Sequence, residues 1–344
     1  MQIDIILEPD LSPAQVAEIA VAAENYGFRT LWHSNYHQNP DAFVALVPAA
    51  LATKKIRLGI LAISPYEMHP LKIANATQTL NEISNGRTIV AIGGGGSVMG
   101  AIGMKLDPKA NRMLQSVREA VDIVSSVTAG KLVMNYAGEV FQLSRPLKNG
   151  WAKAARPGIF TCATGPKMLQ LAGEIADGTQ MSDVTPEKIG HHMEALRAGL
   201  AARKTPHADF RIGNFWAGTS RPTARNPCMR RVASWCSAAN CCRRSTTCCP
   251  TTPEERQLVI DKWQNFAKAF WTAAAIEDVP ESIVTRLIAA CSSAGDLGDI
   301  DLQIERFRVF EKAGLTELSI RLFDEPMAGL KIVAEHVLPK FERA

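Results

Sequence analysis

The stretch IRLGILAISPYEMHPLKIANATQTLNEISNGRTIVAIGGGG, residues 56–96, decides the fold class of this chain. It begins and ends with short apolar runs, IRLGILAI and RTIVAI, which are typical of buried strands. Between them lies LKIANATQTLNEISNG, whose apolar residues recur at helical spacing. A strand, a helix and a second strand in this order predict a right-handed crossover between two parallel strands. The stretch therefore predicts one β–α–β unit of an α/β protein.

The same alternation continues along almost the whole chain of 344 residues. After the first strand, Ser12 is placed to cap a helix, Pro13 occupies its first position, and Gly27 ends it. Eight strand-like runs appear in total: IDIIL (3–7), TLWHS (30–34), IRLGILAI (56–63), RTIVAIGGGG (87–96), GIFTCAT (158–164), GTQMS (178–182), FRIGNFWA (210–217) and LTELSIRL (315–322). Eight such units over more than 300 residues predict a (β/α)8 TIM barrel with insertions, as a single domain over residues 1–344.

The alternative architecture is a doubly wound open sheet. Such sheets that bind dinucleotides carry a glycine-rich turn after the first strand. Here that strand leads into EPDLSP. The barrel is therefore the favoured fold. Within it, residues 132–157, LVMNYAGEVFQLSRPLKNGWAKAARP, fit no strand–helix unit, and we interpret them as a small hairpin insertion.

Residues 219–250 differ from the rest of the chain, since they contain six Cys and six Arg but no Asp, Glu, Lys, Leu or Ile. A zinc site needs cysteine pairs at ligand spacing, whereas Cys241–Cys242 and Cys248–Cys249 are directly adjacent. A disulfide cluster conflicts with the intracellular character of the other residues, and a solvated basic loop leaves the cysteines unexplained. A reading frame shifted by one base would convert every Cys codon into a Leu, Met or Val codon. We therefore interpret the segment as the product of two compensating frameshifts, and expect it to bind no metal and form no disulfide.

Composition narrows the class of protein. The chain is 47% hydrophobic and 21% charged, with a formal net charge of +4 from mixed acidic and basic residues. No basic stripe with interleaved aromatic residues is present, so nucleic acid is not an expected partner. No apolar run reaches eighteen residues and MQIDIILEPDLS is unlike a signal peptide, so neither a membrane span nor secretion is expected. Only Cys162 and Cys291 lie outside the anomalous segment, which favours a reducing, cytoplasmic location.

Two glycine-containing loops could bind a ligand. In IFTCATGPKMLQLAGEIADG a strand runs into Gly165 and Pro166, and a helix opens at once. Free backbone N–H groups at that helix start, together with Lys167, would suit a phosphate, although an ordinary helix start explains the same residues. In IGGGGSVMG the glycines, Gly94 and Gly95 among them, would let a flat ring or a phosphate approach the backbone closely. A flexible loop is the alternative, and no P-loop lysine follows.

Three histidines are candidates for a base or a metal ligand. In AISPYEMHPLKIA the prolines predict a rigid loop, on which His69 could act as a base or simply form hydrogen bonds. His33 and His37, in WHSNYHQNPD, do not lie on a predicted helix, so they are not expected to bind a metal ion together. No metal site is therefore expected.

Taken together, AENYGFRTLW, residues 52–95 and GPKMLQLAGEIADG resemble signature blocks of the luciferase-like monooxygenase superfamily, in order and at similar spacing. The resemblance covers nearly the whole chain except residues 219–250. It is closest to the branch containing the deazaflavin-dependent methylenetetrahydromethanopterin reductases. It implies a (β/α)8 barrel that binds FMN or coenzyme F-420 at the carboxyl ends of its strands.

The resemblance also implies roles for particular residues. Leu61 and Ala62 would lie against the isoalloxazine ring, where the family often has a non-prolyl cis peptide. Gly94 and Gly95 would lie beside the ring or the ribityl chain. The cofactor phosphate would be held by three consecutive residues, Gly165, Pro166 and Lys167.

One departure concerns the chemistry. The deazaflavin branch usually carries an Asp-His pair after the second strand, and this chain has Asn35-Tyr36. We therefore take Asn35 and His69 as the candidate catalytic residues and favour FMN over coenzyme F-420. The expected activity is an FMN-dependent monooxygenase acting on a small organic substrate. Reduced FMN would come from a separate flavin reductase, because no nicotinamide domain is visible. A homodimer is compatible with this assignment.

Two alternatives remain open at this point. The first is an F-420-dependent reductase that transfers hydride to a small carbonyl or imine. The second is a flavin-binding protein without catalytic activity. The substrate cannot be read from the sequence, because variable loops determine it.

Overall fold

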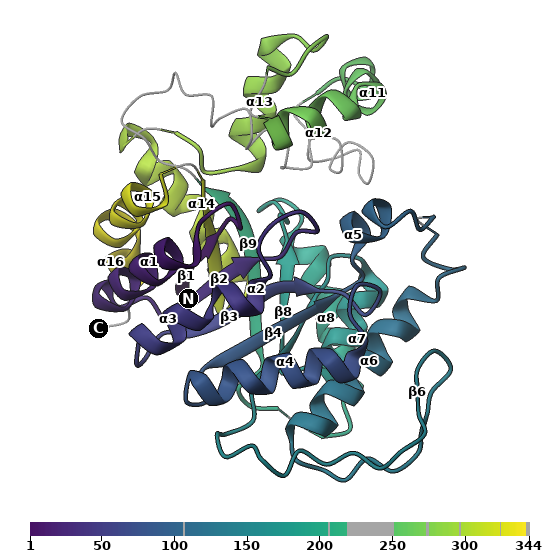
Figure 1. Cartoon of the computed structure of the whole chain (residues 1–344). Helices are drawn as coiled ribbons and strands as arrows, with labels where there is room; N and C mark the ends of the chain where they lie inside the picture. Colours follow the sequence, from purple (N-terminus) through teal and green to yellow (C-terminus); the bar gives the residue numbers. More distant parts are fainter. Residues whose placement is uncertain are drawn as a thin grey trace. The chain divides into compact units, whose positions relative to one another are not determined.

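Eight parallel strands close into a barrel in the order β1-β10-β9-β8-β7-β4-β3-β2, which confirms the predicted (β/α)8 fold (Figure 1). The computed structural model describes residues 1–105, 107–205, 207–218, 251–272, 275–295, 297–323 and 325–341. The chain divides into two compact units. One comprises residues 4–182 and 191–213, and the other residues 1–3, 183–190 and 214–344. The anomalous residues 219–250, and the predictions made for their cysteines, lie outside the described residues.

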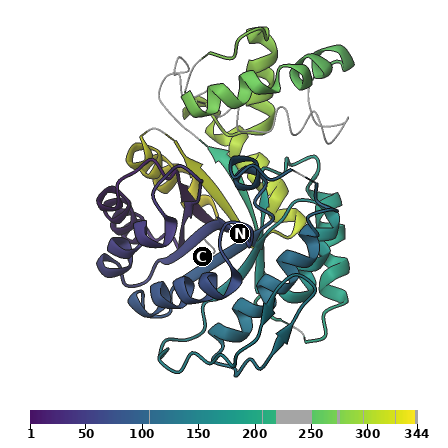
Figure 2. The ribbon, with the colours of Figure 1, turned by 45° about the vertical axis from the view of Figure 1, so that its right-hand side comes forward.

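The first of these units holds most of the strand–helix pairs. Its strands are β1 (Gln2–Leu7, from Asp4 onward), β2 (Thr30–Ser34), β3 (Arg57–Ile63), β4 (Thr88–Gly93), β7 (Gly158–Cys162) and β8 (Gly178–Ser182). Its helices are α1 (Pro13–Tyr26), α2 (Ala42–Ala45), α3 (Val47–Ala52), α4 (Pro70–Ile83), α5 (Gly96–Ala101), α6 (Met113–Thr128), α7 (Pro166–Ile175) and most of α8 (Ile189–Ala201). On the outside of the strands α1 lies beside α3, and α4 beside α6 (Figures 1 and 2).

The helix boundaries follow the local signals in the sequence. Ser12 forms a capping box with Gln15 at the start of α1, and Gly27, at φ 92°, ends this helix by donating its N–H to carbonyls of the last turn. The sequence pattern predicts one continuous helix over residues 41–55, but the structure has two, α2 and α3. They meet at Leu46, because Pro48 has no N–H to donate and its ring would clash with the carbonyl four residues earlier.

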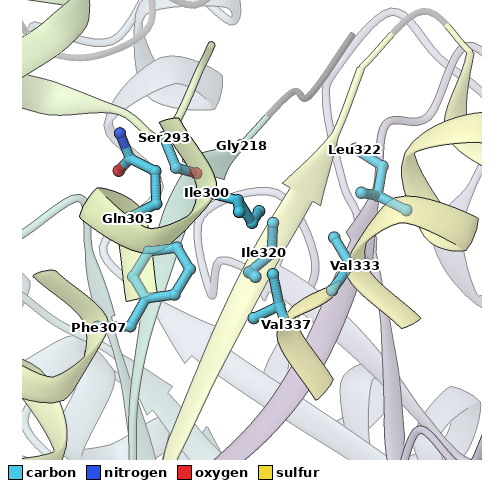
Figure 3. A pocket seen from close by; sticks show the side chains of 9 residues that line it. All are labelled: Gly218, Ser293, Ile300, Gln303, Phe307, Ile320, Leu322, Val333 and Val337. Atoms are coloured by element: carbon cyan, nitrogen blue, oxygen red, sulfur yellow. The ribbon is translucent and has the colours of Figure 1, made fainter. Parts of the chain in front are cut away.

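The second unit contains the last two barrel strands and the C-terminal helices. These elements are β9 (Arg211–Gly218, from Asn214 onward), β10 (Glu317–Leu322), α11 (Pro253–Asp261), α12 (Trp263–Thr272), α13 (Glu281–Cys291), η1 (Leu297–Asp299), α14 (Ile300–Ala313), α15 (Pro326–Ile332), the π-helical turn η2 (Val333–Val337) and α16 (Leu338–Phe341). Ile320 of β10, Phe307 of α14, and Val333 and Val337 of η2 line a cavity of about 30 Å³ (Figure 3). This space holds about one water molecule, so it is a small packing gap.

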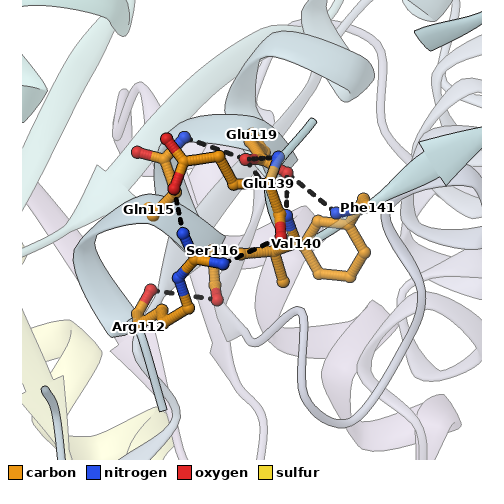
Figure 4. Close-up of polar contacts among 7 residues, drawn as sticks. All are labelled: Arg112, Gln115, Ser116, Glu119, Glu139, Val140 and Phe141. Atoms are coloured by element: carbon orange, nitrogen blue, oxygen red, sulfur yellow. Dashed lines mark hydrogen bonds and ion pairs between the residues drawn. The ribbon is translucent and has the colours of Figure 1, made fainter. Parts of the chain in front are cut away.

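The predicted hairpin insertion is present. Strands β5 (Tyr136–Ala137) and β6 (Gln142–Leu143) pair antiparallel. The buried carboxylate of Glu119, on α6, accepts hydrogen bonds from the backbone N–H groups of Glu139 at 2.7 Å, Val140 at 3.0 Å and Phe141 at 2.8 Å (Figure 4). One side chain therefore fixes the turn of the hairpin to the barrel helix.

The amino end of the barrel is filled by a polar and aromatic cluster. Arg211 reaches Asp4 at 3.4 Å and Thr30 at 3.1 Å, and its guanidinium lies over the ring of Phe160. Trp32 packs against the same ring, with centroids 5.8 Å apart. Burial raises the pKa of the Asp4 carboxyl, and the charge of Arg211 opposes this shift. The cluster fills the interior between the strands at this end, and the active sites of such barrels lie at the carboxyl ends of the strands, so the candidate site is sought there.

Within the described residues, no helix is long and apolar enough to cross a bilayer. The same part of the chain holds no group of three His, Cys, Asp or Glu side chains placed to bind a metal ion. Of the two cysteines in these described residues, Cys162 is partly exposed and Cys291 is buried.

Candidate active site at the carboxyl ends of β2, β3, β4 and β7

Strand register brings four loops of one unit to the same end of the barrel. Ser34 of β2 pairs with Leu61 of β3, and Ile63 of β3 pairs with Ile92 of β4. Gly93, the last residue of β4, pairs with Cys162, the last residue of β7. The loops that begin at residues 35, 64, 94 and 163 therefore follow adjacent strands. The candidate site residues predicted from the sequence lie on these loops, at the strand ends beside them, or, for Pro166 and Lys167, in the first turn of α7.

A non-prolyl cis peptide joins Leu61 and Ala62, at the position implied by the family resemblance. The pairing of β3 with β4 changes register between Leu61 and Ile63. Asn35 binds this segment twice, because its N–H donates to the Leu61 carbonyl at 2.9 Å and its Nδ2 donates to the Ala62 carbonyl at 3.2 Å. The predicted residues Asn35, Leu61 and Ala62 are thus in direct contact.

Glu67 is a candidate site residue that sequence reasoning missed. Its Oε1 accepts the backbone N–H of Ser64 at 2.6 Å, and both carboxylate oxygens lie 3.3 Å from Nδ2 of Asn35. Burial raises the pKa of this carboxyl, and the negative charge of Asp41 raises it further. The hydrogen bonds from Ser64 and Asn35 oppose the shift without cancelling it. A half-buried carboxyl with a raised pKa therefore lies beside the cis peptide.

The glycines after β4 pack closely against two neighbouring segments, the loop after β3 and the start of α6. Gly95 adopts φ +65°, and a Cβ on this residue would collide with the side chain of Ser64. A Cβ on Gly94 would lie 2.6 Å from Sδ of Met113. From Gly96 the chain forms the short helix α5, a helix that the glycine-rich sequence did not predict. The predicted glycine loop thus ends after Gly95, which lies against the side chain of Ser64.

The start of α7 is open and uncapped. Gly165 is its N-cap residue, Pro166 occupies the first turn, and no side chain makes a capping hydrogen bond there. A Cβ on Gly165 would meet no atom within 4 Å, and Lys167 is exposed. Helix N-termini leave N–H groups unpaired within the helix, and their dipole favours an anion.

The structure places His69 apart from these contacts. His69 is the N-cap residue of α4, where its Nδ1 accepts the N–H of Leu71 at 3.2 Å. Its ring is exposed and meets the edge of Phe141, with centroids 5.3 Å apart. The local role of His69 is that of a helix cap, and its role as a base stays a prediction.

The chemistry of these residues suits a phosphate at one place. Gly95 packs against the side chain of Ser64, so the loop after β4 lies against the loop after β3. After β7, which neighbours β4, the uncapped start of α7 presents backbone N–H groups, and Lys167 adds a positive charge. Both are features that favour binding of a phosphate. Backbone N–H groups at the start of α7, the ammonium group of Lys167 and the half-buried carboxyl of Glu67 are therefore among the chemical groups at this end of the barrel.

A hollow of this unit, about 240 Å³ in volume, lies at the opposite, amino ends of the strands. Its arginines have structural partners. Arg156 pairs with Asp177 at 2.7 Å, and Arg87 donates to backbone carbonyls that include those of Ile56 at 2.6 Å and Ser84 at 2.7 Å. Such contacts stabilise the bottom of a barrel and leave the candidate site at the other end.

Comparison with known proteins identifies the family of this chain. The chain belongs to the luciferase-like monooxygenase family, whose model matches residues 2–317. It is 30% identical to the 5,10-methylenetetrahydromethanopterin reductase of Archaeoglobus fulgidus, over 99% of this chain and 100% of that protein. The family assignment confirms the resemblance found in the sequence.

Solved structures share the fold at lower identity. The coenzyme F-420-dependent tetrahydromethanopterin reductase of Methanopyrus kandleri superposes with a TM-score of 0.74 at 24% identity, over 99% of both chains. A type II Baeyer–Villiger monooxygenase from Pseudomonas putida, in complex with FMN, superposes with a TM-score of 0.65 at 17% identity, over 99% of both chains. The chain is thus an oxidoreductase-type barrel of this superfamily, and its fold is compatible with either of the two cofactors.

Proposed function

We propose that this chain is a coenzyme F-420-dependent reductase that transfers hydride to the carbon of a small carbonyl or imine. The observation that carries the proposal is the full-length similarity to the Archaeoglobus reductase. The proposal reverses the order of the two activities expected from the sequence, which favours FMN because Asn35 replaces the acid of the deazaflavin branch. In the structure, however, Asn35 donates to the carboxylate of Glu67, so this corner of the site does contain an acid.

Different residues of the chain would bind the phosphate and the ring of the cofactor. N–H groups at the start of α7, with the ammonium group of Lys167, would hold the phosphate. Backbone at Leu61–Ala62 and at Gly94–Gly95 would flank the ring. When bound, the reduced deazaflavin supplies the hydride.

Two titrations test the choice of cofactor. Coenzyme F-420 and FMN are each titrated into the full chain, with ligand fluorescence as the readout. We expect F-420 to bind at least tenfold more tightly, which corresponds to about 1.4 kcal/mol. Reduced F-420 is then mixed without oxygen with 5,10-methylenetetrahydromethanopterin, and separately with acetone, and the return of its oxidised absorbance is followed. Tighter binding of FMN, or no oxidation of reduced F-420 by either acceptor, would contradict the proposal.

The second candidate is the FMN-dependent monooxygenase of the original expectation. The FMN-bound Pseudomonas monooxygenase, which shares the fold, is the observation in its favour. On this hypothesis a separate reductase must supply reduced FMN. The discriminating result is oxygen uptake, with product formation, when the chain is mixed with reduced FMN and oxygen.

A further inference from the structure

We propose that the hollow at the amino ends of the strands is a second ligand site, which binds a phosphate dianion, either as the free ion or as a phosphate monoester. The hollow has a volume of about 240 Å³, which is enough for a tetrahedral anion together with bound water. It lies within one unit of the chain, at the end of the barrel opposite the candidate active site. The inference goes beyond the proposed reductase function and does not depend on it.

The hollow is lined by arginines from four separate segments of the chain. Each of them stands at the start of a strand or just before it, and parallel strands bring their starts to the same end of a barrel. Two aspartates and one histidine also line the hollow, so its formal charge is +2 when the histidine is neutral. The charged and titratable lining residues are Arg57 (β3), Arg87 (before β4), Arg156 (before β7), Arg211 (β9), Asp177, Asp209 and His207.

The charge of Arg87 is not neutralised by the groups that hold its side chain. Its Nε donates to the Ser84 carbonyl at 2.7 Å, and its two terminal nitrogens donate to uncharged oxygens of residues 50, 53 and 56. Burial lowers the pKa of this guanidinium, although the charge of Glu24 opposes the shift. The positive form is therefore destabilised at this place, and a bound anion would stabilise it.

The carboxylate of Asp177 offsets only part of the remaining charge, because several donors share it. It accepts Arg156 at 2.7 Å and the backbone N–H of Ile159 at 2.8 Å, and it lies 3.3 Å from Nε2 of His207. Its hydrogen-bonding capacity is thus largely used within the protein, and Arg156 keeps further N–H donors that could bind an oxyanion.

The carboxyl of Asp4 is a weak counter-charge for Arg211. The two side chains are 3.4 Å apart, which is long for a charge-assisted hydrogen bond. Burial raises the pKa of Asp4, and the charges of Arg211 and Arg57 oppose the shift. A carboxyl that resists ionisation compensates nearby arginines less than an exposed aspartate does, so positive charge predominates in the hollow.

Apolar side chains complete the lining and strengthen the effect of these charges. Ile89, Pro157 and Phe160 lie beside the charged groups, and apolar walls lower the local dielectric constant. A guanidinium presents N–H donors in a planar fork that matches two oxygens of a phosphate. A dianion would offset the formal charge of +2, whereas a chloride or a single carboxylate would offset half of it. Phosphate is therefore the ligand class that the hollow favours.

The test is calorimetric titration of the full chain with sodium phosphate and, separately, with glycerol phosphate. Ionic strength is held constant, because salt screens these charges. Arg57→Gln removes a positive charge from the lining and Asp209→Asn a negative one, and both side chains are exposed, so the fold should tolerate either change. Arg29→Gln is the matched control. Arg29 is also exposed and directly precedes β2 at the same end of the barrel, but it is not among the residues that line the hollow.

We expect at least one of the two ligands to bind the unaltered chain with a dissociation constant of about 1 mM or below. Arg57→Gln should weaken this binding roughly tenfold, Asp209→Asn should strengthen it severalfold, and Arg29→Gln should change it by less than about threefold. Because a ligand that binds the folded state stabilises it, phosphate should raise the melting temperature of the unaltered chain more than that of Arg57→Gln. Tighter binding of inorganic phosphate would identify the free ion as the occupant, and tighter binding of glycerol phosphate would identify an ester. Either result supports the site.

The start of α7 also offers a place for a phosphate, so the titrations are repeated with Lys167→Ala. Affinity that is lost in Lys167→Ala and kept in Arg57→Gln would place the phosphate at α7 and overturn the proposal. The absence of binding by both ligands, or equal losses in Arg57→Gln and Arg29→Gln, would overturn it as well. No redox cofactor or acceptor is present in these titrations, so their outcome is independent of the reductase assays.

Discussion

Replacing Gly95 with alanine should damage both the stability of the protein and its ligand site, whereas the same change at Gly96 should not. Gly95 has φ +65°, a conformation that costs an alanine about 1–2 kcal/mol relative to glycine. The new methyl group would also collide with the side chain of Ser64. Overpacking of this kind typically costs about 1–3 kcal/mol. The expected loss in the free energy of unfolding is therefore roughly 2–5 kcal/mol.

The neighbouring glycine provides the control. A Cβ on Gly96 would meet no atom within 4 Å, and Gly96 is the first residue of α5. Because alanine favours a helix over glycine by up to about 1 kcal/mol, Gly96→Ala should be neutral or slightly stabilising.

Urea denaturation of the full chain measures the stability of both variants, and F-420 fluorescence measures ligand binding. Any displacement of Ser64 also moves the N–H group that holds Glu67. Gly95→Ala should therefore weaken F-420 binding as well as stability. Equal losses for the two variants, or a loss below about 1 kcal/mol for Gly95→Ala, would refute the packing argument.

Three further outcomes are expected. Lys167→Ala should weaken F-420 or FMN binding about tenfold while riboflavin, which has no phosphate, is affected little; equal losses would mean that α7 has an ordinary helix start. Glu119→Gln should cost roughly 1.5–3 kcal/mol and expose residues 132–157 to limited proteolysis. Although burial would raise the pKa of Glu119, its hydrogen bonds lower it, so the stabilising contribution should be lost as pH falls through the folded-state pKa. Burial lowers the pKa of His33 from 6.5 to about 4, so between these pH values the folded state binds fewer protons than the unfolded state. The free energy of unfolding should therefore decrease by roughly 3 kcal/mol as the pH falls from 6.5 to 4. A His33→Leu variant with the same pH dependence would contradict this.

The barrel could be predicted because its signals are local. Alternation of apolar runs with amphipathic stretches located all eight strands, and Ser12, Pro13 and Gly27 marked the ends of α1. Helix α5 could not be predicted in this way, because glycine has a low helix propensity. It forms because Val98 and Met99 are buried, and such packing overrides propensity.

The loops that carry the candidate binding residues could be predicted from the family resemblance, whereas Glu67 could not. The cis peptide at Leu61–Ala62 and the open helix start at Gly165 lie where the signature blocks implied. Glu67 carries no comparable signal. Its importance comes from a contact with Asn35, which lies 32 residues earlier in the chain, and loops have no periodicity that reports such contacts. Sequence reasoning therefore treats Asn35 as a lost acid, since the neighbouring carboxylate becomes visible only in three dimensions.

The packing of α7 against α8 restricts how this protein could evolve a new cofactor preference. A Cβ on Gly173 would lie 2.6 Å from the Leu200 nitrogen, and a Cβ on Gly199 would overlap the Gln170 carbonyl. At these two glycines the backbones of α7 and α8 are therefore in direct contact. No side chain lies between them whose size could be changed to move the helix. Replacement of Gly173 or Gly199 by a larger residue should consequently destabilise this part of the protein. The variation that selection can use lies in the few residues before the helix, where a Cβ on Gly165 finds open space.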